Sequence, residues 1–131
     1  MKIIFDKTKD DYQYPISQKN LKLLFQIIPE NWKSGIKTIH FLGQEPDKTR
    51  FERPANKISL SNKLNLSVLG LSEKDIITEI LIELVQDSHF GNLRAASYKK
   101  LTKVQTAKIK EIIEPYMLRY FSEKQENKNG A

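Results

Sequence analysis

The stretch ISLSNKLNLSV, residues 58–68, carries the clearest local signal of secondary structure in the sequence. Apolar residues occupy its even positions apart from Asn62, and polar residues occupy its odd positions, which is the period of a strand with one buried face. Ser61-Asn62-Lys63 supplies turn residues in the middle. The stretch therefore predicts a β-hairpin with strands near 57–61 and 64–69. The buried face would carry Ile58, Leu60, Leu64, Leu66 and Val68, and the wet face Ser59, Ser61, Asn65 and Ser67.

Two further strands are predicted on the N-terminal side of the hairpin. Residues 2–5 (KIIF) are a short apolar run that Asp6 ends. Residues 36–42 (IKTIHFL) lie between Gly35 and Gly43 and carry apolar residues at both odd and even positions. That pattern is typical of a strand covered on both faces.

Three helices are predicted, near 18–28, 73–87 and 103–122. Ser17 and Ser72 precede the first two as N-caps, and Thr102 with Gln105 forms a capping box before the third. Pro29 ends the first helix, and the segment after it predicts a turn or a short irregular helix. Pro115 lies inside the third helix and is expected to kink or divide it.

The order of these elements predicts an α+β fold. Three strands are contiguous in the middle of the chain and two helices follow them, which favours a small, mostly antiparallel sheet packed by helices over a doubly wound fold. Residues 1–121 are expected to form a single domain. Residues 122–131 (SEKQENKNGA) are too polar to bury, so they predict a disordered tail.

Composition excludes several functional classes. The chain has 131 residues, a formal net charge of +6 and no cysteine, so disulfides, cysteine-based zinc sites, iron–sulfur clusters and thiol catalysis are excluded. No apolar run approaches the roughly 18 residues that a membrane span needs. The first residues are too polar for a secretory leader. A soluble, cytoplasmic protein without a cofactor and without a membrane partner is expected.

Few side chains point to catalysis. The sequence lacks the common nucleotide-binding, hydrolase and H-E-x-x-H motifs. His40 and His89, the two histidines, are interpreted as packed or surface residues. Glu79, Glu83 and Asp87 share one helical face, where carboxylates could bind a metal or transfer protons. The preferred interpretation is a solvated acidic stripe, because no second segment supplies further ligands.

Residues 36–90 resemble a small zincin-type metallopeptidase domain. In that family a strand and a hairpin precede a capped helix that carries H-E-x-x-H. The corresponding helix here reads Ile82-Glu83-Leu84-Val85-Gln86, which keeps the glutamate and lacks both histidines. Without two imidazoles this site could not hold zinc in the usual way. The resemblance therefore implies a zincin-like scaffold without peptidase activity, with no metal site.

Two binding functions remain. The first is a non-catalytic domain that binds another protein, with a candidate interface at Arg50, Phe51 and Arg53 in the charged loop 43–56, because aromatic and arginine residues are frequent at interface hot spots. Trp32 is interpreted as core. The alternative is nucleic-acid binding through region 94–110, since residues 91–131 carry 9 basic and 4 acidic residues. Its candidate residues are Arg94, Tyr98, Lys99, Lys100, Lys103 and Lys108.

Overall fold

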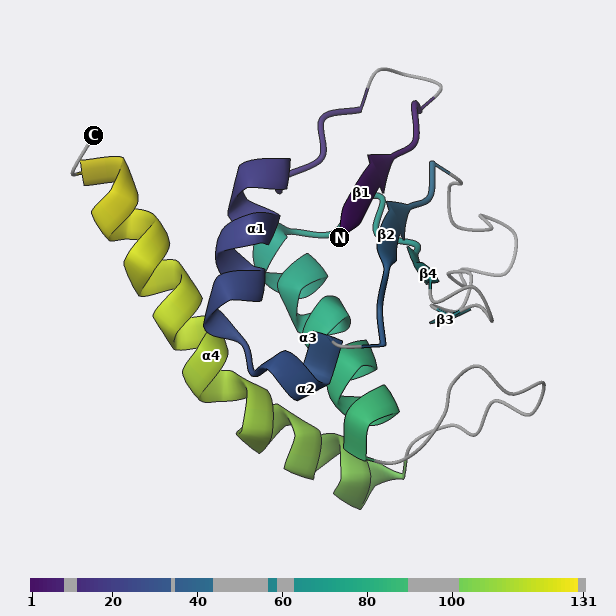
Figure 1. Ribbon diagram of the computed structural model, residues 1–131, viewed down its shortest axis with the longest axis vertical. Coiled ribbons are helices and arrows are strands. Elements are labelled where there is room, and N and C mark those ends of the chain that lie inside the picture. Colours follow the sequence, from purple (N-terminus) through teal and green to yellow (C-terminus); the bar gives the residue numbers. More distant parts are fainter. Residues whose placement is uncertain (9–11, 34, 44–56, 59–62, 90–101, 130–131) are drawn as a thin grey trace.

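The computed structural model describes residues 1–8, 12–33, 35–43, 57–58, 63–89 and 102–129 (Figure 1). Both helices and strands are present, as an α+β chain requires. The elements follow one another as β1 (Lys2–Phe5), α1 (Gln18–Ile27), α2 (Glu30–Lys33), β2 (Thr38–Phe41), β3 (Lys57–Ile58), β4 (Lys63–Leu66), α3 (Glu73–His89) and α4 (Lys103–Asn129). No helix in these ranges is both long and apolar enough to cross a membrane.

The sheet has the strand order β1-β2-β4-β3, and the expectation of a mostly antiparallel sheet is wrong. β2 pairs in parallel with β1 on one side and with β4 on the other, and only β3 and β4 pair in an antiparallel way. The physical reason lies in the connections. α1 and α2 lie between β1 and β2 in the chain, and a crossover of that kind returns the chain in the same direction.

The register of the parallel strands aligns the apolar side chains in rows. Ile39 stands between Ile3 and Leu64, and Phe41 stands between Phe5 and Leu66. Ile39, Phe41, Leu64 and Leu66 are fully buried. The Phe5 and Phe41 rings stack with centroids 4.8 Å apart. The neighbouring residues of β2, Thr38 and His40, therefore belong to the opposite face of the sheet.

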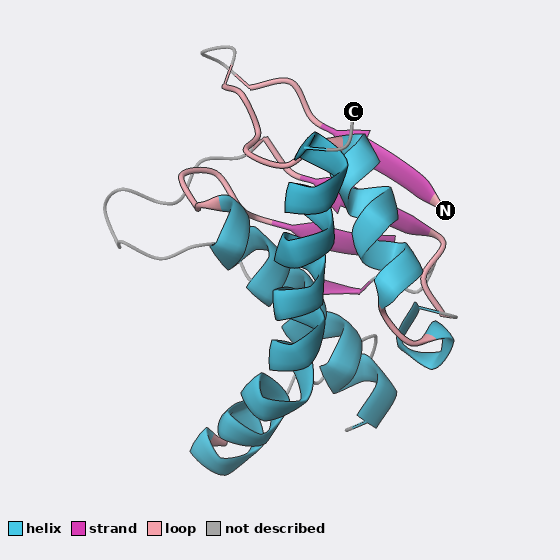
Figure 2. Ribbon diagram, turned by 90° about the vertical axis from the view of Figure 1, so that its left-hand side faces the viewer, coloured by secondary structure: helices cyan, strands magenta, loops and turns pink. Residues whose placement is uncertain are grey.

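The helices form a second and a third layer beside the sheet. Figures 1 and 2 show α1 and α3 next to the strands and α4 on the outside of these two helices. The core between the layers includes Leu21 and Leu24 of α1. Buried side chains of α3 make up much of the rest: Ile76, Ile77, Ile80, Leu81, Leu84 and Val85. Trp32 of α2 belongs to the same core, as expected, and its ring lies against Tyr116 of α4.

The helix starts are the most local features, and the sequence places them correctly. The Ser17 hydroxyl accepts a hydrogen bond from the Asn20 amide at 3.1 Å, and the Ser72 hydroxyl accepts one from the Asp75 amide at 3.2 Å. Each bond satisfies an amide that has no partner within its own helix. Thr102 and Gln105 exchange the two hydrogen bonds of a capping box, at 3.0 and 3.1 Å.

α4 is continuous through Pro115, and Figure 1 shows it bent near its middle rather than divided. Pro115 and Glu111, whose carbonyl loses its helical donor, are both exposed, so water can replace the missing hydrogen bond. The helix also continues to Asn129, past the start of the expected disordered tail at 122. Lys124 explains this, because its ammonium group bonds the Glu73 carboxylate at the start of α3.

The hairpin is confirmed in part. β3 and β4 pair in an antiparallel way, with Ile58 opposite Leu64. Leu64, Leu66 and Val68 are fully buried, while the Ile58 and Leu60 side chains lie outside the described residues. The expectation that Ser67 faces water is wrong, since it is only 2% exposed. β4 ends at Leu66, so the alternation of a strand no longer applies at Ser67, where the chain turns towards α3.

Candidate functional site

The structure brings few of the sequence-predicted site residues together. Lys103 and Lys108 are exposed on the first turns of α4. The other four candidates for nucleic-acid binding lie outside the described residues, as do all three candidates for the protein interface: Arg94, Tyr98, Lys99, Lys100, Arg50, Phe51 and Arg53. Neither candidate surface is therefore tested by the geometry, and both remain predictions.

The acidic residues of α3 do not form a solvated stripe, which corrects the preferred interpretation. Glu83 is 5% exposed and Glu79 is half-buried. The Asp87 side chain is not among those that the structure describes. Gln86, one turn after Glu83, is also buried. No group of three or more histidine, aspartate or glutamate side chains is placed to hold a metal ion within the described ranges. The motif segment 82–86 thus contributes to the interior of the protein.

A polar cluster joins the ends of β1 and β2. The Nε2 atom of His40 lies 2.6 Å from Oδ1 of Asp6, the residue that follows β1. The amide of Gly43 donates to Oδ2 of the same carboxylate at 3.2 Å. The Tyr14 hydroxyl donates to the Asp6 carbonyl at 3.0 Å. His40, interpreted from the sequence as a packed or surface residue, is half-buried. Its contact with Asp6 could not be predicted from local patterns, because the two residues are 34 positions apart.

The electrostatics of this cluster favour the ionised form of Asp6. The hydrogen bond from His40 lowers the pKa of the Asp6 carboxyl, and the Gly43 amide and the charges of His40 and Lys63 act in the same direction. Partial burial opposes them but does not reverse the shift. The arrangement is a carboxylate that orients an imidazole and ties two strand ends together.

Protonation of Asp6 at acidic pH should lower the stability of the folded protein. Because the folded-state pKa of Asp6 is below its ordinary value of 3.8, Asp6 stabilises the fold above about pH 4, and this contribution is lost as pH falls through the folded-state pKa. We expect the free energy of unfolding to fall more steeply below about pH 4 in the natural protein than in Asp6→Asn, which cannot titrate. Urea unfolding from pH 2.5 to 6 measures this difference.

The control for that measurement is His40→Ala. This change removes the largest cause of the shift, so the Asp6 pKa, followed by carbon NMR of its carboxyl group, should rise towards its ordinary value. An unchanged Asp6 pKa in His40→Ala would contradict the assignment of the shift to His40.

An apolar groove lies between α3 and α4, with a volume of about 650 Å³. Ile113 lies at its floor and is almost fully buried, and Met117 and Phe121 are half-buried along it. Leu118, next to Met117, is 65% exposed. On the α3 side, the Thr78 hydroxyl lies 3.6 Å from the Met117 sulfur atom, so the two helices meet along this line.

Charged side chains border the groove. Lys74 of α3 and Lys110 and Glu114 of α4 line it, and all three are exposed. This surface was not predicted from the sequence. Positions 110, 114, 117, 118 and 121 follow helical spacing as well, one residue beyond the buried stripe at 109, 113, 116 and 120. A second stripe of this kind on the same helix is the signal that could have revealed the groove.

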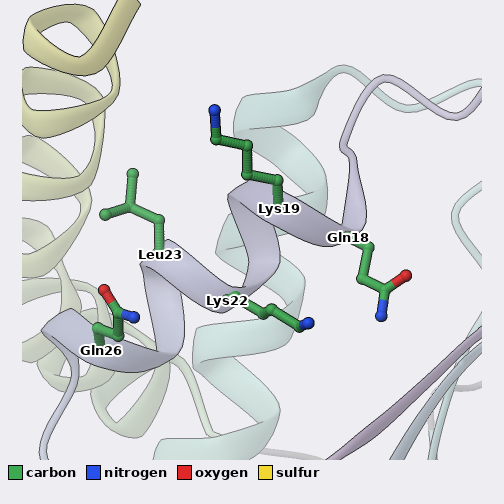
Figure 3. A pocket seen from close by; sticks show the side chains of 5 residues that line it. All are labelled: Gln18, Lys19, Lys22, Leu23 and Gln26. Carbon is green, nitrogen blue, oxygen red and sulfur yellow. The ribbon is translucent and has the colours of Figure 1, made fainter.

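A second hollow lies on α1 and differs in chemistry. Figure 3 shows its lining side chains, which all come from one helix: Gln18, Lys19, Lys22, Leu23 and Gln26. Leu23 and Gln26 extend towards α4, and Lys22 extends to the other side of α1. Leu23 is its one apolar side chain, so this hollow lacks the apolar row of the α3–α4 groove. Its two lysines provide a matched control for experiments on the groove.

Comparisons with known proteins give limited information. No protein-family model matches the chain, and no solved structure matches it. A glucose-6-phosphate isomerase from Buchnera aphidicola subsp. Cinara cedri (strain Cc) is 33% identical over 110 residues, which cover 79% of this chain and 20% of the isomerase. The chain thus spans about a fifth of the length of the curated relative it matches. A similarity of this extent leaves the function to be argued from the geometry.

Proposed function

We propose that this chain is a non-catalytic, cytoplasmic domain that acts by binding another protein through the α3–α4 groove. The observation that carries the proposal is the row formed by Met117, Leu118 and Phe121, with Leu118 65% exposed. Apolar residues that adjoin one another on the surface are typical of interaction sites when they form a large patch, whereas single exposed apolar residues are common. Met117 and Phe121 are half-buried and extend the apolar surface on either side of exposed Leu118.

The residues around Met117, Leu118 and Phe121 are arranged as in a protein–protein interface. Its apolar centre is bordered by exposed Lys74, Lys110 and Glu114, and interfaces commonly have an apolar core within a polar rim. Leucine and phenylalanine on a rigid helix can be buried by a partner at little cost in backbone entropy. The role proposed for Asp6 and His40 is structural, because they connect β1 to β2.

The other two hypotheses remain proposals with distinct signatures. Nucleic-acid binding through residues 94–110 would appear as an affinity for DNA or RNA whose logarithm falls steeply with the logarithm of salt concentration. A zincin-like scaffold without peptidase activity would also act by binding. This hypothesis therefore differs from the main proposal in the evolutionary origin of the domain and not in its function. The similarity to a fifth of an isomerase supplies no reason to propose isomerase activity.

Site-specific photo-crosslinking tests the proposed function. A benzoylphenylalanine at position 118 should crosslink a defined protein in an extract of the source cells, while the same group at exposed Gln26 of α1 should not. Phe121→Asp, which places a charge in the groove, should reduce the crosslink at position 118 by about tenfold or more. Equal crosslinking from positions 118 and 26, or no effect of Phe121→Asp, would contradict the proposal.

A further inference from the structure

We infer that the partner enters the α3–α4 groove as an amphipathic helix with acidic residues at both ends of its apolar face. This inference rests on the proposed function and names the class of partner. Two features of the groove support it, namely the secondary structure of its walls and the placement of its lysines. The positive net charge of the chain supports it as well.

The walls of the groove favour a helix over an extended peptide. Both walls are α-helices, whose backbone amides and carbonyls are bonded within the helix along most of their length. An extended peptide gains its affinity from hydrogen bonds to a sheet edge, which these walls cannot offer. Its buried backbone groups would lose their water without finding partners, whereas a helix satisfies its own backbone groups.

The two lysines lie at opposite ends of the groove. α3 and α4 are antiparallel, because Glu73 at the start of α3 bonds Lys124 near the end of α4. Lys74 therefore lies near the Phe121 end, and Lys110 lies three turns away at the other end. The α4 stretch from 110 to 121 is about 17 Å long at 1.5 Å per residue, which matches roughly eleven residues of a bound helix.

The lysines are available to a partner. Neither Lys74 nor Lys110 forms an ion pair with another residue of the described ranges, and both are exposed. Acidic residues about three turns apart on the bound helix would meet one lysine each, and apolar residues between them would cover Met117, Leu118 and Phe121. The single Glu114 in the middle of the rim leaves the groove with a net positive charge.

A second copy of this chain is a poorer occupant than an acidic partner. The chain carries a formal net charge of +6, so two copies repel each other and their association is disfavoured at low salt. An acidic partner is attracted by the same field, which increases its association rate. Charge complementarity thus selects an acidic helix rather than self-association.

The test uses designed helical peptides as probes. The first is a 16-residue stapled helix with leucines at i, i+4 and i+7 and glutamates about three turns apart at the ends of that face. The second carries lysines in place of these glutamates, and the third has the composition of the first in a scrambled order. By fluorescence anisotropy the acidic helix should bind about tenfold or more tightly than the lysine helix, and the difference should shrink with salt.

A charge-swap variant and a matched control complete the test. Lys74→Glu with Lys110→Glu should reverse the preference, so that the lysine helix binds more tightly than the acidic one. Lys19→Glu with Lys22→Glu changes the net charge equally but alters only the hollow on α1, and it should keep the original preference. Leu118→Asp should abolish binding of both ordered helices, while circular dichroism confirms that the variant is folded.

Several outcomes would overturn the inference. These are equal binding of the acidic, lysine and scrambled helices, an equal effect of the two double variants, or a dimer of the natural protein that Leu118→Asp dissociates. If the acidic helix fails to bind while the crosslink from position 118 persists, the proposed function stands and the partner is not an acidic helix. If both fail, the proposed function is wrong as well.

Discussion

Leu66→Ala is expected to lower the free energy of unfolding by about 2–5 kcal/mol, which is the usual cost of truncating a fully buried leucine. Leu66 is fully buried at the end of β4, opposite Phe41 of β2, so its removal leaves a cavity between the sheet and the helices. Leu66 belongs to the main hydrophobic core, whose packed side chains can fill such a cavity only in part. Urea unfolding of the two proteins at one pH measures the difference.

Asn65→Ala is the matched control. Asn65 precedes Leu66 on the same strand, faces the other side of the sheet and is half-buried. Its side-chain hydrogen bond, to the Lys63 carbonyl, is long at 3.4 Å, so its loss should cost less than about 1 kcal/mol. Similar losses of stability in Leu66→Ala and Asn65→Ala would show that the two faces of β4 are wrongly assigned.

β4 also shows which features of a strand can be predicted from the local sequence. Alternation in residues 58–68 correctly predicted the burial of Leu64 and Leu66, because successive side chains of a strand point to opposite faces. Val68 is buried as predicted, but it lies beyond the end of β4, where alternation does not apply. Alternation carries no information on which strand lies alongside. β4 pairs in parallel with β2, and that pairing depends on where the intervening chain returns. The relative direction of the strands was therefore predicted wrongly from the sequence.

Capping residues and helix spacing were predicted better than contacts between helices. Ser17, Ser72 and Thr102 act within four residues of themselves, so their roles follow from the local sequence. The end of the third helix, predicted near 122, lies instead at Asn129. Lys124, beyond the predicted end, bonds Glu73, which is 51 residues away in the chain, and distant contacts of this kind are not visible in the local sequence.

The candidate groove could have been predicted only in outline. Two adjacent stripes on α4 are visible in the sequence, but both contain apolar residues, and the spacing does not reveal which one is buried. Contact with α3 and α1 decides this, since Tyr120 is fully buried and Leu118 is exposed. Burial and the neighbouring Glu73 raise the pKa of the Tyr120 hydroxyl above its ordinary range, as expected for a side chain enclosed between the two helices.

Gly43→Ala is expected to destabilise the protein by about 1–3 kcal/mol, the usual cost of inserting an atom into a packed site. A β-carbon at position 43 would lie 2.6 Å from the Lys7 carbonyl oxygen and 3.2 Å from the β-carbon of Asp6. The first contact involves backbone, so a side-chain rotation cannot relieve it. The ends of β1 and β2 must separate, or the Gly43 amide must turn away from Asp6.

The variant should also change the acid response, because it disturbs the hydrogen bond from the Gly43 amide to Oδ2 of Asp6. That bond helps to lower the pKa of Asp6, so the pKa should rise in Gly43→Ala, though less than in His40→Ala, where the largest cause is removed. Urea unfolding gives the loss of stability and carbon NMR gives the pKa. Gly43→Ala with natural stability and an unchanged Asp6 pKa would show that β1 and β2 do not approach this closely at their ends.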